Sequence, residues 1–133
     1  MKAYDPLKDP NPQRWLELDE SERIGLVMRY HRRAGTKVPN LKIHATIQAV
    51  VESQVAMGDE IPVRRTLERL QDEGLDRHEA LHAVGCVLAQ HMYDLATDPP
   101  PGDPNVRYFA ELEQLTAEAW LRGDYGTQDD LES

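Results

Sequence analysis

Cysteine and phenylalanine each occur only once in the 133 residues, and positive charge is in short supply. The single Cys86 excludes an intramolecular disulfide and suits a reducing compartment such as the cytoplasm. Lys and Arg number 15 against 24 Asp and Glu, and the net charge of −9 disfavours nucleic acid and anionic membranes as partners. No apolar run approaches the roughly 20 residues that span a bilayer, and no signal core or glycine-rich phosphate loop is evident. We therefore expect a cytoplasmic protein that binds neither nucleic acid nor membrane.

The composition predicts a folded helical domain. Hydrophobic residues make up 40% of the chain and charged residues 29%. No segment alternates between polar and apolar residues as strands do, whereas helical periodicity recurs along the chain. The sequence predicts an all-α fold, a bundle of four main antiparallel helices plus a short N-terminal helix. The expected organisation is an extended N-terminal arm over 1–12, a single helical domain over 13–122 and a mobile acidic tail over 123–133.

Capping residues indicate where the helices begin. Asp19, Asn40 and Asp76 stand at predicted N-caps, and Gly35 follows a predicted C-terminus. A run of four prolines in 99–104 separates the last helix, which is expected to continue unbroken to about residue 122. The apolar periodicity predicts that the buried side chains include those of Leu16, Ile43 and Met92.

The helix over 76–96 contains His78-Glu79-Ala80-Leu81-His82, a match to the H-E-x-x-H signature of zinc hydrolases. Two imidazoles four residues apart can bind one zinc ion, and Glu79 could activate its water. The alternative is a capping box, in which Asp76 accepts from the N–H of Glu79 and Glu79 reaches back to the N–H of Asp76. The capping interpretation is favoured, because a five-residue pattern recurs by chance and a carboxylate used as a cap is not a free base.

A second constellation lies on the helix over 40–57. His44, Gln48 and Glu52 recur every four residues and form a polar stripe that could face His78 and His82. A metal site made of His44, Glu52, His78 and His82 would suit one divalent transition metal, namely zinc, iron or nickel. The alternative is a metal-free polar seam of hydrogen-bonded histidines. Spacing alone favours the seam, since it places no ligand at about 2 Å from an ion.

These residues resemble a known family. The pattern runs from Tyr30-His31 through Asn40-Leu41-Lys42-Ile43-His44, Gln48, Glu52-Ser53-Gln54, Pro62, Leu70, Gly74 and His78-Glu79-x-x-His82 to Tyr108-Phe109-x-Glu111-Leu112. It resembles the bacterial family named domain of unknown function eighteen-forty-one. The family pattern has histidine at the position of Gln48, so the matching histidines are His44, His78 and His82. The resemblance implies a small bacterial helical protein and no particular reaction.

The predicted function is that of a non-catalytic helical protein whose histidines bind a metal or form a polar seam. Two alternatives stay open: a metal-dependent hydrolase using the H-E-x-x-H match with Glu79 or Glu52 as base, and a metal-free protein-interaction module. The hydrolase is disfavoured because zinc proteases generally bind substrate along a strand edge, and no strand is expected. A homodimer or another protein partner also stays open, and an outward-facing Trp15, Tyr93 or Trp120 would favour a homodimer.

Overall fold

The computed structural model describes residues 1–125, and every regular element in that range is a helix, so the prediction of an all-α fold is confirmed. None of the helices in this range is long and apolar enough to cross a membrane. The elements in chain order are α1 (Pro12–Glu17), α2 (Glu20–Ala34), α3 (Leu41–Ala56), the short 3₁₀ helix η1 (Gly58–Glu60), α4 (Val63–Asp72), α5 (Arg77–Thr97), α6 (Asn105–Gln114) and α7 (Ala117–Leu121).

The capping residues act as the sequence predicts. The side chains of Asp19, Asn40 and Asp76 each accept a hydrogen bond from the backbone N–H three residues later. Each bond satisfies one of the N–H groups that a helix N-terminus leaves without a partner. At the other end of α2, Gly35 adopts a left-handed conformation with φ of 72°, which costs glycine little.

The predicted unbroken last helix is wrong, because the chain leaves the helix between α6 and α7. Leu115 has an extended backbone, and its side chain is fully buried in the core. Thr116 then starts α7 by accepting from the N–H of Ala119. Residues 1–125 therefore form seven α-helices and one 3₁₀ helix, rather than four main helices plus one short helix.

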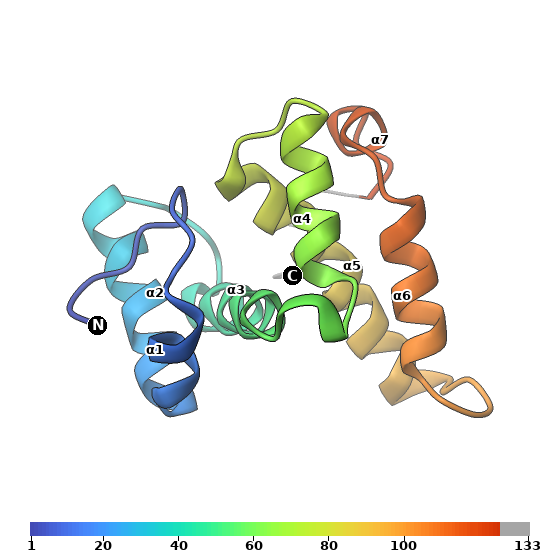
Figure 1. Cartoon of the computed structure of the whole chain (residues 1–133), viewed down its shortest axis with the longest axis horizontal. Helices are drawn as coiled ribbons and strands as arrows, with labels where there is room; N and C mark the ends of the chain where they lie inside the picture. The colour runs from blue at the N-terminus through green and yellow to red at the C-terminus, as the bar shows by residue number, and fades with distance from the viewer. Residues whose placement is uncertain (126–133) are drawn as a thin grey trace.

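Helix α3 is the element around which the others are arranged (Figure 1). It packs against α1 and α2 on one side and against α4 and α5 on the other, while α6 contacts α4 and α5. The approach of α3 to α5 is close at Gly85, where an added Cβ would lie 3.3 Å from Cγ2 of Ile47. This close packing brings the polar residues of α3 next to the histidines of α5.

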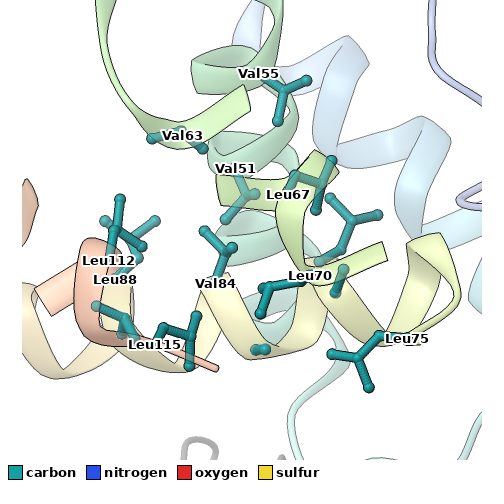
Figure 2. Packing of buried hydrophobic residues seen from close by; sticks show 14 of the residues in the cluster. Val51, Val55, Val63, Leu67, Leu70, Leu75, Val84, Leu88, Leu112 and Leu115 are labelled. Atoms are coloured by element: carbon teal, nitrogen blue, oxygen red, sulfur yellow. The ribbon is translucent and has the colours of Figure 1, made fainter. Parts of the chain in front are cut away.

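The apolar side chains form two separate cores, one on each side of α3. The N-terminal core joins the arm, α1, α2 and α3, and it consists of Tyr4, Trp15, Leu26, Val27, Ala45 and Ala49. The C-terminal core joins α3 to α4, α5, α6 and the start of α7, and its labelled members are shown in Figure 2. Helix α3 contributes to both cores, with Ala45 and Ala49 on one side and Val51 and Val55 on the other.

Three apolar residues that we expected to be buried are exposed. Leu16, Ile43 and Met92 are 43%, 44% and 49% exposed, so the predictions for these positions are wrong. Each lies near the end of its helix, where the periodic pattern continues but no other element covers the side chain. Met92 and the neighbouring Tyr93, which is 64% exposed, lie on the outer part of α5.

The predicted arm carries no helix before Pro12, but it is packed into the structure through Tyr4, which is 2% exposed. At the other end, the predicted mobile tail lies mostly in 126–133, outside the described residues. Tyr125, the last described residue, packs against the C-terminal core.

We expect Leu70→Ala to lower the free energy of unfolding by about 2–5 kcal/mol, because it removes a fully buried side chain from the C-terminal core. Leu121→Ala is the matched control, since Leu121 is 71% exposed and its truncation should cost no more than about 0.5 kcal/mol. Urea denaturation followed by circular dichroism measures both. Equal losses in the two variants would contradict this description of the core.

Candidate functional site

Four imidazoles from three helices lie together between the two cores. We call His31 of α2, His44 of α3, and His78 and His82 of α5 the histidine cluster. The ring centroids of His31 and His44 are 4.5 Å apart, and those of His44 and His82 are 5.2 Å apart. The circuit closes through His82 and His78 at 4.4 Å and through His78 and His31 at 5.9 Å.

Helix geometry explains how the cluster forms. His78 and His82 are one turn apart on α5 and therefore share a face. His44 is opposite His82, as the polar stripe on α3 predicts. His31 follows Val27 by one turn on α2, which places it at the inner edge of the N-terminal core. His91, the remaining histidine, is elsewhere and stacks on Tyr108 with a centroid distance of 4.9 Å.

The cluster contains buried ring nitrogens without a hydrogen-bond partner. The Nε2 atoms of His78 and His82 are both inaccessible to solvent and unpaired. Buried polar atoms are almost always hydrogen-bonded, because leaving one unpaired costs about 1–3 kcal/mol. Two such atoms on one helix face, next to a third imidazole, are therefore a feature that needs a functional explanation.

All four rings are held neutral near pH 7. Burial, and after it the neighbouring imidazoles, lower the pKa of His82 to about 3 and that of His44 to about 4. Burial is also the main cause that lowers the pKa values of His31 and His78. A neutral imidazole keeps a lone pair on one ring nitrogen, which is the form that binds metal ions.

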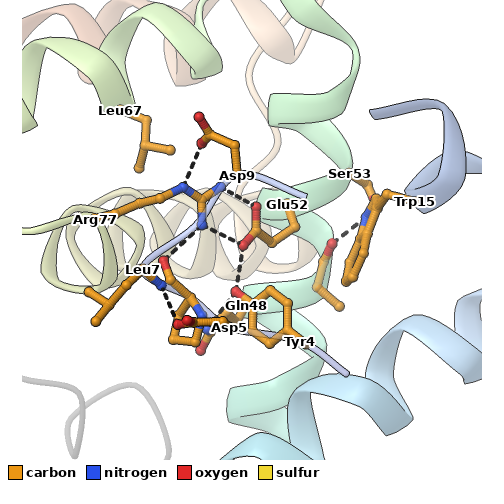
Figure 3. Close-up of polar contacts among 12 residues, drawn as sticks. Tyr4, Asp5, Leu7, Asp9, Trp15, Gln48, Glu52, Ser53, Leu67 and Arg77 are labelled. Atoms are coloured by element: carbon orange, nitrogen blue, oxygen red, sulfur yellow. Dashed lines mark hydrogen bonds and ion pairs between the residues drawn. The ribbon is translucent and has the colours of Figure 1, made fainter. Parts of the chain in front are cut away.

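A chain of polar side chains connects the cluster to a buried ion pair, and Figure 3 shows the part of it from Arg77 to Gln48. Arg77 donates to both carboxylate oxygens of Glu52, with distances of 2.6 and 2.8 Å. The hydroxyl of Tyr4 donates to Glu52 and accepts from Nε2 of Gln48 at 3.0 Å. The Oε1 atom of Gln48 is 3.0 Å from Nε2 of His31. We call this chain from Arg77 to His31 the polar relay.

The polar relay determines which nitrogens carry protons. The carboxylate of Glu52 accepts from Arg77 in the ion pair, and the Tyr4 hydroxyl donates to it as well. Burial and the charge of Glu52 raise the pKa of Tyr4, which keeps that proton in place. Gln48 therefore turns its amide nitrogen to Tyr4 and its oxygen to His31, so Nε2 of His31 must carry a proton. Nε2 of His44 lies 3.1 Å from Nε2 of His31 and therefore accepts from its N–H.

Of the five predicted site residues, the three histidines lie together in the cluster, whereas the carboxylates of Glu52 and Glu79 are bound to other groups. Both oxygens of Glu52 contact Arg77 or Tyr4, so Glu52 is not among the histidines, and it enters no ligand set below. The Oε1 atom of Glu79 accepts from Nε1 of Trp120 at 2.6 Å. Asp76 accepts from the N–H of Glu79, as predicted, but the carboxylate of Glu79 is bound to Trp120 rather than free to act as a base.

The sequence patterns did not place Tyr4, His31 or Arg77 in the candidate site. His31 and Arg77 could have been found, because each stands one turn from an inward apolar residue: Val27 precedes His31 and Leu81 follows Arg77. Tyr4 belongs to an irregular proline-rich segment, where no periodicity shows which side chain is buried.

The cluster is not a complete metal site in its present geometry. Among residues 1–125, no group of three or more His, Cys, Asp or Glu side chains is placed so that it could hold a metal ion. Comparisons with protein-family models, with curated proteins and with solved structures find no match to this chain. The family resemblance of the sequence therefore stays a prediction.

We expect Arg77→Met to lower the free energy of unfolding by about 3–5 kcal/mol, because it leaves the carboxylate of Glu52 buried without its counter-charge. The double variant Arg77→Met/Glu52→Leu should recover part of that loss in a double-mutant cycle. Arg122→Met, at an exposed ion pair, is the control and should leave the free energy of unfolding almost unchanged. A double variant no more stable than Arg77→Met would contradict the pairing.

We expect the metal-free protein to lose stability as the pH falls from about 6.5 to 5. The folded-state pKa values of His44 and His82 lie below the ordinary 6.5, so the unfolded chain binds more protons in this range. Each neutral histidine contributes a slope of up to about 1.4 kcal/mol per pH unit. Denaturation in chelator at several pH values measures the slope, which should be shallower in His82→Gln. A free energy that is constant over this range would contradict the neutral cluster.

Proposed function

We propose that the histidine cluster binds one divalent transition-metal ion through Nε2 of His44, His78 and His82. The observation that carries the proposal is the pair of buried, unpartnered Nε2 atoms on His78 and His82 beside a third imidazole. Metal binding would give these atoms the partner that no protein group supplies. The activity that this supports is metal binding without catalysis, because the carboxylate of Glu79 is already bound by Trp120.

The spacing of the rings supports this ligand set. Zinc–nitrogen bonds of about 2.0–2.1 Å in a tetrahedral site put the centroids of two imidazole ligands about 5 Å apart. The separations of 5.2 Å for His44 and His82 and 4.4 Å for His82 and His78 lie near that value. Ion binding would require the rings to turn about χ2, a soft torsion in histidine, until their nitrogens point at one centre. It would also replace the contact of 3.1 Å between Nε2 of His44 and Nε2 of His31.

The ligand chemistry limits the choice of metal. Imidazole is a borderline donor that suits zinc, nickel, iron and copper, whereas magnesium and calcium prefer oxygen ligands. The proposed set has three nitrogens and no carboxylate or thiolate. We therefore propose zinc, nickel or iron(II) as the ion, and we expect magnesium and calcium not to bind.

Untagged protein purified without chelator should contain about one equivalent of a transition metal by elemental analysis. Chelator should lower the melting temperature, since an ion at 100 times its Kd stabilises the folded state by about 2.7 kcal/mol. Loss of a residue that only supports a metal ligand lowers metal affinity by about 10–100-fold. His78→Gln and His82→Gln each remove a proposed ligand and should weaken metal binding by more than that. His91→Gln, a buried histidine outside the cluster, is the control and should bind normally.

Protein without stoichiometric metal, with a melting temperature that neither chelator nor added zinc changes, would leave the cluster as a metal-free polar seam. The protein would then match the interaction module that the sequence left open.

A further inference from the structure

We propose a second binding site, separate from the histidine cluster: a cavity beside the ion pair of Arg77 with Glu52 that binds a small aliphatic amine in its protonated form. The cavity has a volume of about 240 Å³, and its walls come from the arm, the C-terminal half of α3 and α4. None of the four clustered histidines lines it. Binding at this cavity would therefore not depend on a metal ion.

Apolar side chains form much of the cavity wall. Val55 of α3 and Leu67 of α4 are buried core residues that border the cavity, and Pro10 of the arm is half-buried beside it. Figure 3 shows Asp9 and Leu67 on the side of the ion pair that faces away from Tyr4. A small cavity with such walls suits a short hydrocarbon stem, because the stem leaves water when it binds.

The ion pair at the inner end of the cavity carries more negative than positive charge. The guanidinium of Arg77 is shared by two carboxylates, that of Glu52 at 2.6 Å and that of Asp9 at 2.7 Å. Both oxygens of Glu52 are bound by Arg77 or Tyr4, and its side chain is fully buried. The side chain of Asp9 is 79% exposed, so its carboxylate is accessible to a ligand at the mouth of the cavity.

The α4 wall has the same imbalance. The guanidinium of Arg64 is shared by the carboxylates of Asp59 at 3.0 Å and Glu68 at 3.5 Å, and Glu68 is 63% exposed. With the two carboxylates on Arg77, four carboxylates share two guanidinium groups, which leaves a formal surplus of two negative charges. A bound cation would reduce this surplus, whereas an anion would be repelled. The net charge of −9 on the chain acts in the same direction.

A protonated primary amine on a short aliphatic stem fits both the walls and the charges. Its ammonium group can donate to the exposed carboxylates of Asp9 and Glu68, which both border the cavity. Its stem can lie against Val55 and Leu67. Lysine side chains bind in the same way, with the hydrocarbon stem on apolar surface and the charged end in a polar setting. The small volume favours a free amine such as n-butylammonium.

The test titrates the full-length protein with n-butylammonium and follows the backbone amide chemical shifts by NMR. Saturating shifts should appear at Val55, Ala56 and Leu67, which border the cavity. Ethylammonium should bind at least about tenfold more weakly, because it lacks two CH₂ groups that each contribute about fourfold in affinity when buried. n-Butyrate, with a similar stem and the opposite charge, should cause no saturating shifts.

Two variants with matched controls locate the site. Glu68→Gln should weaken n-butylammonium binding by about two- to fivefold, because it removes an exposed carboxylate at the cavity. Glu113→Gln removes a similarly exposed carboxylate outside the cavity and should bind like the wild-type protein. Ala56→Leu should fill the cavity and abolish binding, whereas Ala110→Leu, on the exposed face of α6, should not.

Equal affinities for ethylammonium and n-butylammonium, comparable binding of n-butyrate, or shifts that do not saturate would overturn the proposal. Equal losses in Glu68→Gln and Glu113→Gln would overturn it too, because they would indicate attraction to the acidic chain as a whole. If Ala56→Leu does not fold, the two glutamate variants decide.

Discussion

The buried ion pair between Arg77 and Glu52 is the interaction on which the arrangement of this protein depends. Both side chains are almost completely inaccessible, and such a pair is tolerated only when its remaining donors and acceptors are also satisfied. Here they are satisfied from distant parts of the chain. The arm contributes the carbonyl of Pro6 and the hydroxyl of Tyr4, and Asp9 takes the Nε of Arg77. The pair thus joins the arm, α3 and α5, and it sets the order of donors and acceptors that continues to the histidine cluster.

Helix α3 separates two apolar cores, and this explains why a polar seam can exist inside a small protein. One face of the helix presents alanines to the N-terminal core, and another presents valines to the C-terminal core. The stripe between them holds His44, Gln48 and Glu52, which are all buried. With two cores, the relay and the cluster fill the boundary between them.

The cluster is costly as a purely structural device. Four neutral imidazoles contribute little apolar burial for their volume, and two of them leave a buried nitrogen unpaired. Phenylalanine or leucine at these positions would pack the same boundary without that cost. Under the proposed function, a bound ion would supply the partners that these two nitrogens lack. The supporting groups, from Gln48 to Arg77, orient the cluster without belonging to its proposed ligand set.

The sequence alone determined the all-α class and the helix starts at Asp19, Asn40 and Asp76, because periodicity and capping are local properties. That His44 could face α5 was a prediction from the polar stripe, and the contact itself depends on how α3 packs against α5. Local spacing could not show that Glu52 would pair with Arg77, that Glu79 would bond Trp120, or that the helix would break at Leu115. Those outcomes depend on which distant residues lie next to each group in the folded protein, and only the tertiary packing decides that. His31 joined the site for the same reason, since its position on α2 became meaningful only when α2 packed against α3.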